Sequence, residues 1–86
     1  MIIRLYKTPT CPRCHRLAGF MQLYEIEFTE EPLDAGAMTE YLCATGKPAM
    51  MAPILQVDES WYGPEQLFEG QQLAVHILQD ILSIGR

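Results

Sequence analysis

The chain has 86 residues, of which 49% are hydrophobic and 20% charged, as in one folded domain rather than a disordered or repetitive chain. We therefore expect a single domain over residues 1–86. The net charge of −5 argues against general nucleic-acid binding, which depends on many contacts between basic residues and phosphates. The charge is uneven: residues 1–24 carry +4 and no acid, whereas residues 25–86 carry −9.

The first predicted element is a strand over residues 2–6, rich in β-branched and aromatic side chains and followed by a turn over residues 7–10. A helix is predicted from Cys11 to about Tyr24, because Pro12 suits the first helical position. Its buried stripe would consist of Cys14, Leu17, Ala18 and Met21. The alternation of polar and apolar residues over 25–29 predicts a second strand, which residues 30–32 would end.

The second half of the chain predicts two further helices around a hairpin. Asp34 can cap a helix that runs to about Thr45 and stops at Gly46, with Met38, Tyr41 and Leu42 on its apolar face. Residues 53–57 and 61–62 read as strands joined by a turn over residues 58–60. A helical turn over residues 64–68 then precedes a helix whose apolar face would contain Leu73, Ala74, Ile77, Leu78 and Ile81. The expected order is βαβαββα, of the α/β class.

Two of the three cysteines, Cys11 and Cys14, form a Cys-x-x-Cys motif, which in a reducing compartment indicates redox chemistry or metal binding. Residues i and i+3 share a helix face, so a disulfide can close between them. The N–H groups and partial positive charge at the helix start favour the thiolate of Cys11. Lys7 and Arg13 would strengthen this effect if they lie close. We therefore predict that Cys11 attacks a disulfide and Cys14 resolves the product.

Two alternatives follow from the same cysteines. A disulfide that encloses two residues gains at most ~2 kcal/mol from chain entropy, so a purely stabilising role is the weaker interpretation. A structural metal site could use Cys11, Cys14 and Cys43 with His15 or His76, although structural zinc usually takes paired ligand spacings and only one pair exists here. Cys43 by itself could be a buried, small apolar residue, a regulatory thiol or a third exchange partner, and the first is favoured because free cysteines are commonly buried.

Three segments together resemble a glutaredoxin or a close glutaredoxin-like relative. They are Tyr6-Lys7-Thr8-Pro9-Thr10-Cys11-Pro12-Arg13-Cys14-His15-Arg16, Met51-Ala52-Pro53, and Tyr62-Gly63-Pro64-Glu65-Gln66-Leu67. The resemblance spans nearly the whole chain. It implies a thioredoxin fold with a four-stranded mixed sheet and helices on both faces, and dithiol-disulfide exchange as the activity. Pro53 would be a cis-proline that faces the two cysteines.

The resemblance also implies where a substrate binds and how the protein is recharged. The expected substrate contacts are Lys7, Pro12, Arg13, Met51, Ala52, Pro53 and Glu65. The substrate would be a disulfide-containing protein or a glutathione mixed disulfide. No cofactor would be tightly bound, and either glutathione or a thioredoxin reductase would supply the electrons. Both routes stay open, because Arg13 replaces the aromatic residue usual between the cysteines and Met51-Ala52-Pro53 replaces Thr-Val-Pro.

The remaining expectations concern location and partners. The sequence shows neither a secretory signal nor an apolar run long enough to span a membrane. We therefore expect a cytoplasmic monomer without membrane or nucleic-acid partners. Met50 and Met51, which precede Pro53, would either fill the core or contact a partner. Two rival functions are a metal or iron–sulfur cluster carrier that uses Cys11, and a redox-switched binding module without turnover.

Overall fold

The computed structural model describes residues 1–84, in which the elements follow the predicted order with a few additions. The elements are β1 (Ile3–Lys7), α1 (Pro12–Leu23), β2 (Thr29–Pro32), α2 (Ala35–Thr45), β3 (Ile54–Val57), β4 (Ser60–Tyr62), α3 (Pro64–Leu67), β5 (Phe68–Glu69), β6 (Gln72–Leu73) and α4 (Val75–Leu82). The short β5–β6 ribbon was not predicted. None of the helices in residues 1–84 has the length and apolar character needed to cross a lipid bilayer.

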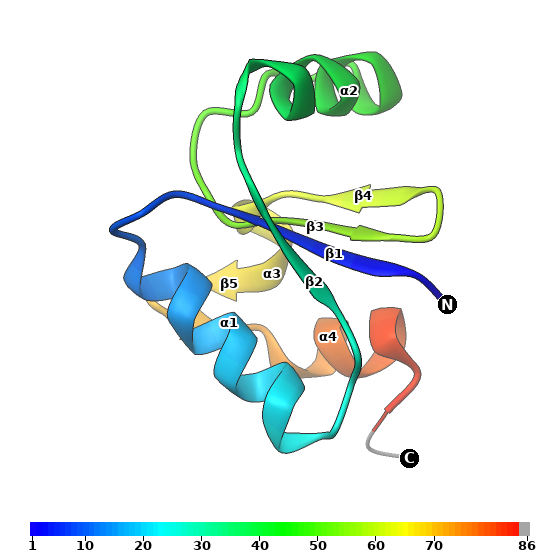
Figure 1. Cartoon of the computed structure of the whole chain (residues 1–86). Coiled ribbons are helices and arrows are strands. Elements are labelled where there is room, and N and C mark those ends of the chain that lie inside the picture. The colour runs from blue at the N-terminus through cyan, green and yellow to red at the C-terminus, as the bar shows by residue number, and fades with distance from the viewer. Residues whose placement is uncertain (85–86) are drawn as a thin grey trace.

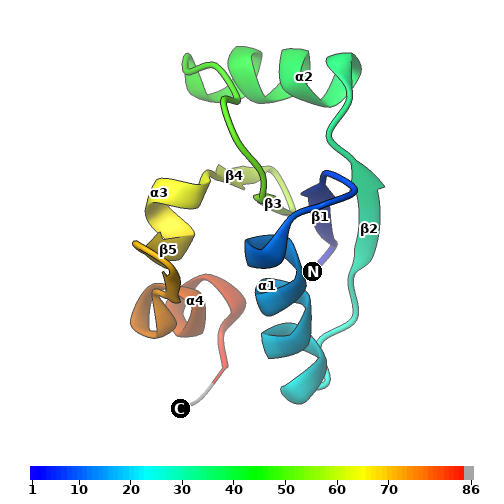
Figure 2. The ribbon, with the colours of Figure 1, turned by 90° about the vertical axis from the view of Figure 1, so that its left-hand side faces the viewer.

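The central sheet has the strand order β2-β1-β3-β4. β1 pairs with β2 in parallel and with β3 antiparallel, and β3 pairs antiparallel with β4. Helix α2 covers one face of this sheet, and α1 and α4 lie on the other (Figures 1 and 2). The structure thus confirms the α/β class, the four-stranded mixed sheet and the helices on both faces.

Successive side chains of a strand point to opposite faces of the sheet, so β1 contributes to two separate cores. Leu5 faces α1 and α4, in a core that contains Leu17, Met21, Leu55, Leu67 and Leu78. Tyr6 faces α2 and packs with Leu33, Ala37, Tyr41 and Ile54. The predicted stripe of α1 is confirmed, because Cys14, Leu17, Ala18 and Met21 are its buried residues.

An aromatic cluster joins α2 to the sheet. The rings of Tyr6 and Trp61 are stacked, with centroids 5.5 Å apart and planes 23° from parallel. Tyr41 of α2 meets Trp61 edge-on, at 5.9 Å and 75°. Both arrangements are favourable for aromatic pairs, so Trp61 contacts both the central strand and the helix above it.

The second strand was predicted in the wrong place. Of the predicted strand over residues 25–29 only Thr29 is in a strand, and β2 covers Thr29–Pro32, so it includes residues 30–32 that were expected to end it. Ile26 and Phe28 do pack against the core, as their alternation indicated. Their backbone, however, lies outside the register that joins β1 to β2, which begins at Arg4 and Thr29.

The faces of two helices also differ from expectation. α2 begins and ends as predicted, with Asp34 and Gly46 as its caps. Its buried residues are Ala37 and Tyr41, whereas Met38 and Leu42 are 41% and 46% exposed. Ala37 and Tyr41 lie one turn apart and pack with Tyr6 and Ile54 of the sheet, so the buried face of α2 follows these two residues and leaves Met38 and Leu42 to one side of it.

In the C-terminal helix α4, Leu78 and Leu82 are buried and Ile77 is exposed. Leu73 precedes this helix in β6 rather than belonging to it. Leu82 lies one turn beyond Leu78, so the buried stripe runs along i and i+4 and leaves Ile77 outside it.

Candidate active site

Cys11 lies immediately before α1 and caps this helix. Its backbone is extended, with φ −134° and ψ 96°, and Pro12 begins the helix. The backbone N–H of Cys14 donates a hydrogen bond to Cys11 Sγ over 3.1 Å. The first turn of α1 contains no acidic residue that would oppose a negative charge. An N–H donor and the positive end of the helix therefore both favour a thiolate at Cys11 once the protein is reduced.

Cys11 and Cys14 form a disulfide with their Cα atoms 5.2 Å apart. Cys14 is only 3% exposed, because it heads the buried stripe of α1, whereas Cys11 is half-buried. In the reduced protein the sulfur of Cys11 is therefore the one that an incoming disulfide can reach. This difference in burial supports the predicted order of attack.

The segment before β3 meets the start of α1 at one end of the molecule, which Figure 2 views face-on. The Ala52–Pro53 peptide bond is cis, as the resemblance implied for Pro53. Met51 and Ala52 line a cavity of about 460 Å³ with Cys11, Pro12 and Arg13. The structure thus brings four expected substrate contacts together around the predicted nucleophile.

Lys7 lies in a different environment from these residues. It forms an ion pair with Glu30 of the neighbouring strand β2. Both residues line a smaller cavity of about 150 Å³ that also contains Cys11 and Cys14, and Lys7 does not line the cavity of Met51. Because Glu30 balances its charge, Lys7 is a weaker candidate than Arg13 for binding a substrate carboxylate.

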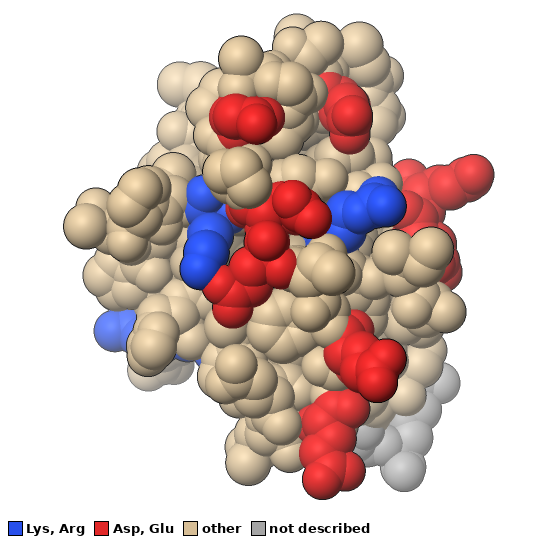
Figure 3. Space-filling view, in the orientation of Figure 1, with Lys and Arg blue, Asp and Glu red and all other residues tan. Residues whose placement is uncertain are grey.

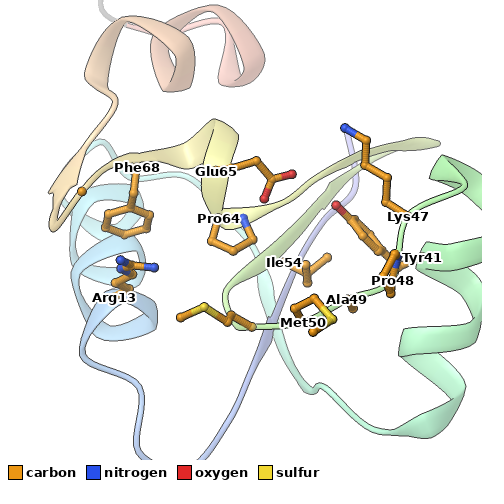
Figure 4. A pocket seen from close by; sticks show the side chains of 12 residues that line it. Arg13, Tyr41, Lys47, Pro48, Ala49, Met50, Ile54, Pro64, Glu65 and Phe68 are labelled. Carbon is orange, nitrogen blue, oxygen red and sulfur yellow. The ribbon is translucent and has the colours of Figure 1, made fainter.

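Glu65 lines another cavity, of about 290 Å³, which shares Arg13 and Met51 with the cavity of about 460 Å³. We call the cavity of about 460 Å³ the first cavity and that of about 290 Å³ the second. Figure 4 shows Arg13 beside Phe68 at one end of this cavity. The guanidinium carbon of Arg13 is 5.7 Å from the centre of the Phe68 ring, within the range of cation–π attraction. Glu65 therefore lines the cavity that adjoins the one lined by Cys11.

Glu65 and Tyr41 project toward each other from α3 and α2 (Figure 4). Burial, and next the negative charge of Glu65, raise the pKa of Tyr41 above its ordinary value of 10.0. Both side chains close over Gly63. A Cβ at Gly63 would come within 2.6 Å of Tyr41 Oη and 2.7 Å of a Glu65 carboxylate oxygen. The lack of a side chain at Gly63 is what lets both groups approach.

Sequence reasoning missed Lys47, Phe68 and Gln71 as residues of this region. Lys47 and Phe68 line the second cavity and Gln71 the first. The backbone carbonyl of Gln71 also accepts a hydrogen bond from Arg16. Phe68 and Gln71 belong to the β5–β6 ribbon and its turn, and strands of two residues are too short to show a periodic pattern.

Cys43 and His76 line none of the three cavities described above, whereas His15 lines the smallest one with Cys11 and Cys14. Cys43 is exposed, which corrects the expectation of burial. It follows the buried Tyr41 by two residues, or roughly 200° around the helix, and so faces away from the sheet. His15 and His76 are also exposed. Within residues 1–84 no three His, Cys, Asp or Glu side chains gather closely enough to hold a metal ion, so the four-ligand site does not assemble there.

Comparison with known proteins identifies the fold. No protein-family model matches the sequence, and no curated protein matches it. Among solved structures, a mutant of the thioredoxin-like protein BC3987 has a TM-score of 0.71 and 21% identity, covering 96% of each chain. The chain has a thioredoxin-like fold.

Two further structures agree with this thioredoxin-like fold. BC3987 without the mutation has a TM-score of 0.65 and 20% identity over 92% of this chain and 97% of that one. A glutaredoxin from Archaeoglobus fulgidus has a TM-score of 0.67 and 14% identity over 93% of this chain and 84% of that one. The fold implied by the resemblance is therefore confirmed, and a cysteine pair at disulfide distance in this fold supports a thiol-redox function.

Proposed function

We propose that this protein is a glutaredoxin-like, dithiol thiol-disulfide oxidoreductase. The observation that carries the proposal is the position of Cys11. Its sulfur caps α1 and accepts a hydrogen bond from the backbone N–H of Cys14. It is also the accessible sulfur of the pair, because Cys14 lies buried one helical turn further along α1. These features favour a thiolate that attacks and a second thiol that resolves.

The reaction exchanges one disulfide for another. The Cys11 thiolate attacks a sulfur of the substrate disulfide, forming a mixed disulfide and releasing one substrate thiolate, which takes up a proton. Cys14 loses its proton and attacks the Cys11 sulfur, which releases the second substrate thiol. The products are two substrate thiols and the Cys11–Cys14 disulfide. The two electrons needed to reduce that disulfide come from glutathione or from a thioredoxin reductase.

In this proposal the substrate lies against Pro12, Arg13, Met51 and Ala52, with Pro53 holding the last two in place. Glu65 and Lys7 act at the edges of the site, since each lines a neighbouring cavity. The substrate is a disulfide-containing protein or a glutathione mixed disulfide. We place the reaction in the cytoplasm and expect the monomer to be the active form.

The first test compares the two accessible cysteines of the reduced protein. Cys43 is exposed but is the third-last residue of α2 rather than a residue at a helix start, so it is a natural internal control. Alkylation of Cys11 should remain rapid below about pH 7, because the thiolate is the reactive form and the helix start favours it, and should there be faster than alkylation of Cys43. Parallel pH profiles at the two positions, measured by mass spectrometry, would contradict the proposal.

The second test traps the intermediate. Cys14→Ser should accumulate a mixed disulfide on Cys11 when it is mixed with a disulfide substrate, because the resolving thiol is gone. Cys11→Ser should form no adduct at Cys14, while Cys43→Ser should turn over normally. A coupled assay with glutathione and its reductase, run beside one with thioredoxin reductase, then identifies the electron source. If the Cys14→Ser protein forms no adduct with any disulfide, the exchange mechanism is wrong.

A further inference from the structure

The first cavity, which Cys11 lines, adjoins the second, and we call the two together the groove. The first is lined by Cys11, Ala52 and Gln71, and the second by Lys47 and Glu65, with Arg13 and Met51 common to both. The first cavity has no acidic side chain in its wall. The one carboxylate of the second, Glu65, is turned against Gly63 and Tyr41.

Arg13, Arg16 and Lys47 lie at or beside this groove, and none of them forms an ion pair within residues 1–84. In residues 1–84, Lys7 is the cation whose charge an ion pair balances, through Glu30. Arg13 lies over the Phe68 ring and Arg16 donates to a backbone carbonyl. Neither contact neutralises a guanidinium group, yet both fix its position, so less side-chain entropy is lost when it binds an anion.

Apart from Glu65, no acidic residue lines the groove within residues 1–84. Glu30 and Glu31 lie on the edge strand β2, and Figure 3 shows acidic side chains along β2 and over α2. The protein is acidic as a whole, with a net charge of −5. A partner with carboxylates beside its disulfide would therefore be repelled from most of the surface and attracted at the groove, which favours one docking orientation.

We propose that the groove binds an extended protein segment whose disulfide is flanked by Asp or Glu, an inference that rests on the proposed function. Its carboxylates would meet Arg13 and Lys47. Met50 and Met51 are 82% and 56% exposed, and such unbranched, polarisable side chains adapt to varied partner surfaces. This apolar rim favours a protein segment over a small anion as the occupant. It also excludes core filling as the role of these two methionines.

The test uses synthetic peptide disulfides that differ only in the residues beside the cysteine, which are Asp, Asn or Lys. The second-order rate constant for oxidation of the fully reduced protein should rank Asp above Asn above Lys. The advantage of Asp over Asn should shrink between about 0.01 M and about 1 M salt, because the Debye length falls from about 30 Å to about 3 Å. Equal rates for the three peptides would overturn the inference.

Charge variants locate the effect. Arg13→Gln and Lys47→Gln should each lower the Asp-to-Asn rate ratio by about two- to fivefold, and Arg13→Lys should retain most of it. Arg4→Gln is the matched control. It changes the net charge equally, but Arg4 lies on β1 and contacts Gln56 rather than the groove, so the ratio should stay the same. An equal loss in Arg4→Gln would mean that only net charge matters and would overturn the inference.

The outcomes separate this inference from the proposed function. Reduction of the Asn peptide measures disulfide exchange itself, so its failure together with that of all other peptides would overturn the proposed function. A glutathione mixed disulfide of the Asn peptide serves as the small-anion arm. If it reacts faster than the Asp peptide, with the same dependence on Arg13 and Lys47, a small anion is the preferred occupant and the protein-segment inference is wrong.

Discussion

At the scale of single residues, Gly63 determines how α2 and α3 meet. Its missing side chain lets Tyr41 Oη and the Glu65 carboxylate close over its Cα. Tyr41 is 3% exposed and is held edge-on against Trp61, so it cannot move aside freely. The Glu65 carboxylate ends a flexible, exposed side chain and can move.

Gly63→Ala should therefore lower the free energy of unfolding by about 1–3 kcal/mol, the usual cost of overpacking. Urea denaturation followed by tryptophan fluorescence measures it. The double variant Gly63→Ala with Tyr41→Phe removes the hydroxyl that the new methyl group meets and should recover part of the loss relative to Tyr41→Phe alone. An unchanged stability in Gly63→Ala would show that the contact with Tyr41 relaxes without cost.

Single residues also show what sequence reasoning could find in the site. Cys11, Cys14 and Pro12 were predicted from local rules alone, because a helix start and an i, i+3 pair depend only on neighbours in the chain. Glu65 depends on tertiary structure: it lies in the second cavity because α3 faces α2 there. Local patterns could not predict that position, and the family resemblance supplied it.

At the scale of elements, α2 illustrates a well-defined start. Asp34 is its N-cap residue, and the backbone N–H of Ala37 donates to Asp34 Oδ1 over 2.9 Å. The helix contributes only Ala37 and Tyr41 to its buried face. A helix held by so few buried side chains depends strongly on its cap.

Asp34→Ala should lower the free energy of unfolding by about 1 kcal/mol, as is typical for the loss of an N-cap. Asp34→Asn should retain most of the stability, since an amide oxygen can accept the same hydrogen bond. Glu40→Ala, an exposed site in the same helix, loses the same charge without losing a cap and serves as the control. Equal effects of Asp34→Ala and Glu40→Ala in urea denaturation would show that the cap contributes nothing.

The elements that sequence reasoning missed share a physical cause. β2 has no buried face, because its residues are exposed or half-buried, so the hydrophobic pattern could not mark it. Its pairing with β1 is fixed by the crossover through α1, in which Glu25 takes a left-handed conformation with φ 57°. The pattern over residues 25–28 did report correctly which side chains face the core. It could not report which backbone groups pair.

At the scale of the whole molecule, the disulfide contributes little to the stability of the fold. It closes a loop of two intervening residues, and both cores lie outside that loop. Reduction should therefore lower the free energy of unfolding by no more than about 2 kcal/mol. Urea denaturation of the oxidised and reduced proteins tests this. A reduced protein that unfolds without denaturant would point to a structural rather than a catalytic disulfide.

The tyrosines predict how the molecule responds to alkaline pH. Burial raises the pKa of Tyr41 and Tyr6 above 10.0 in the folded protein. Above about pH 10 the unfolded chain loses these protons while the folded protein keeps them. The free energy of unfolding should therefore fall as pH rises through this range. Tyr41→Phe should reduce the slope of stability against pH in urea denaturation of the oxidised protein, and an unchanged slope would contradict the assignment.

The position of β2 at the edge of the sheet also bears on self-association. An edge strand offers unpaired backbone groups on which another copy could add. Two copies that approached along β2 would bring their Glu31 side chains near one another, and Pro32 has no N–H to donate. Addition of further copies along β2 is therefore disfavoured, whereas the exposed side chains of Met50 and Met51 stay accessible to other proteins.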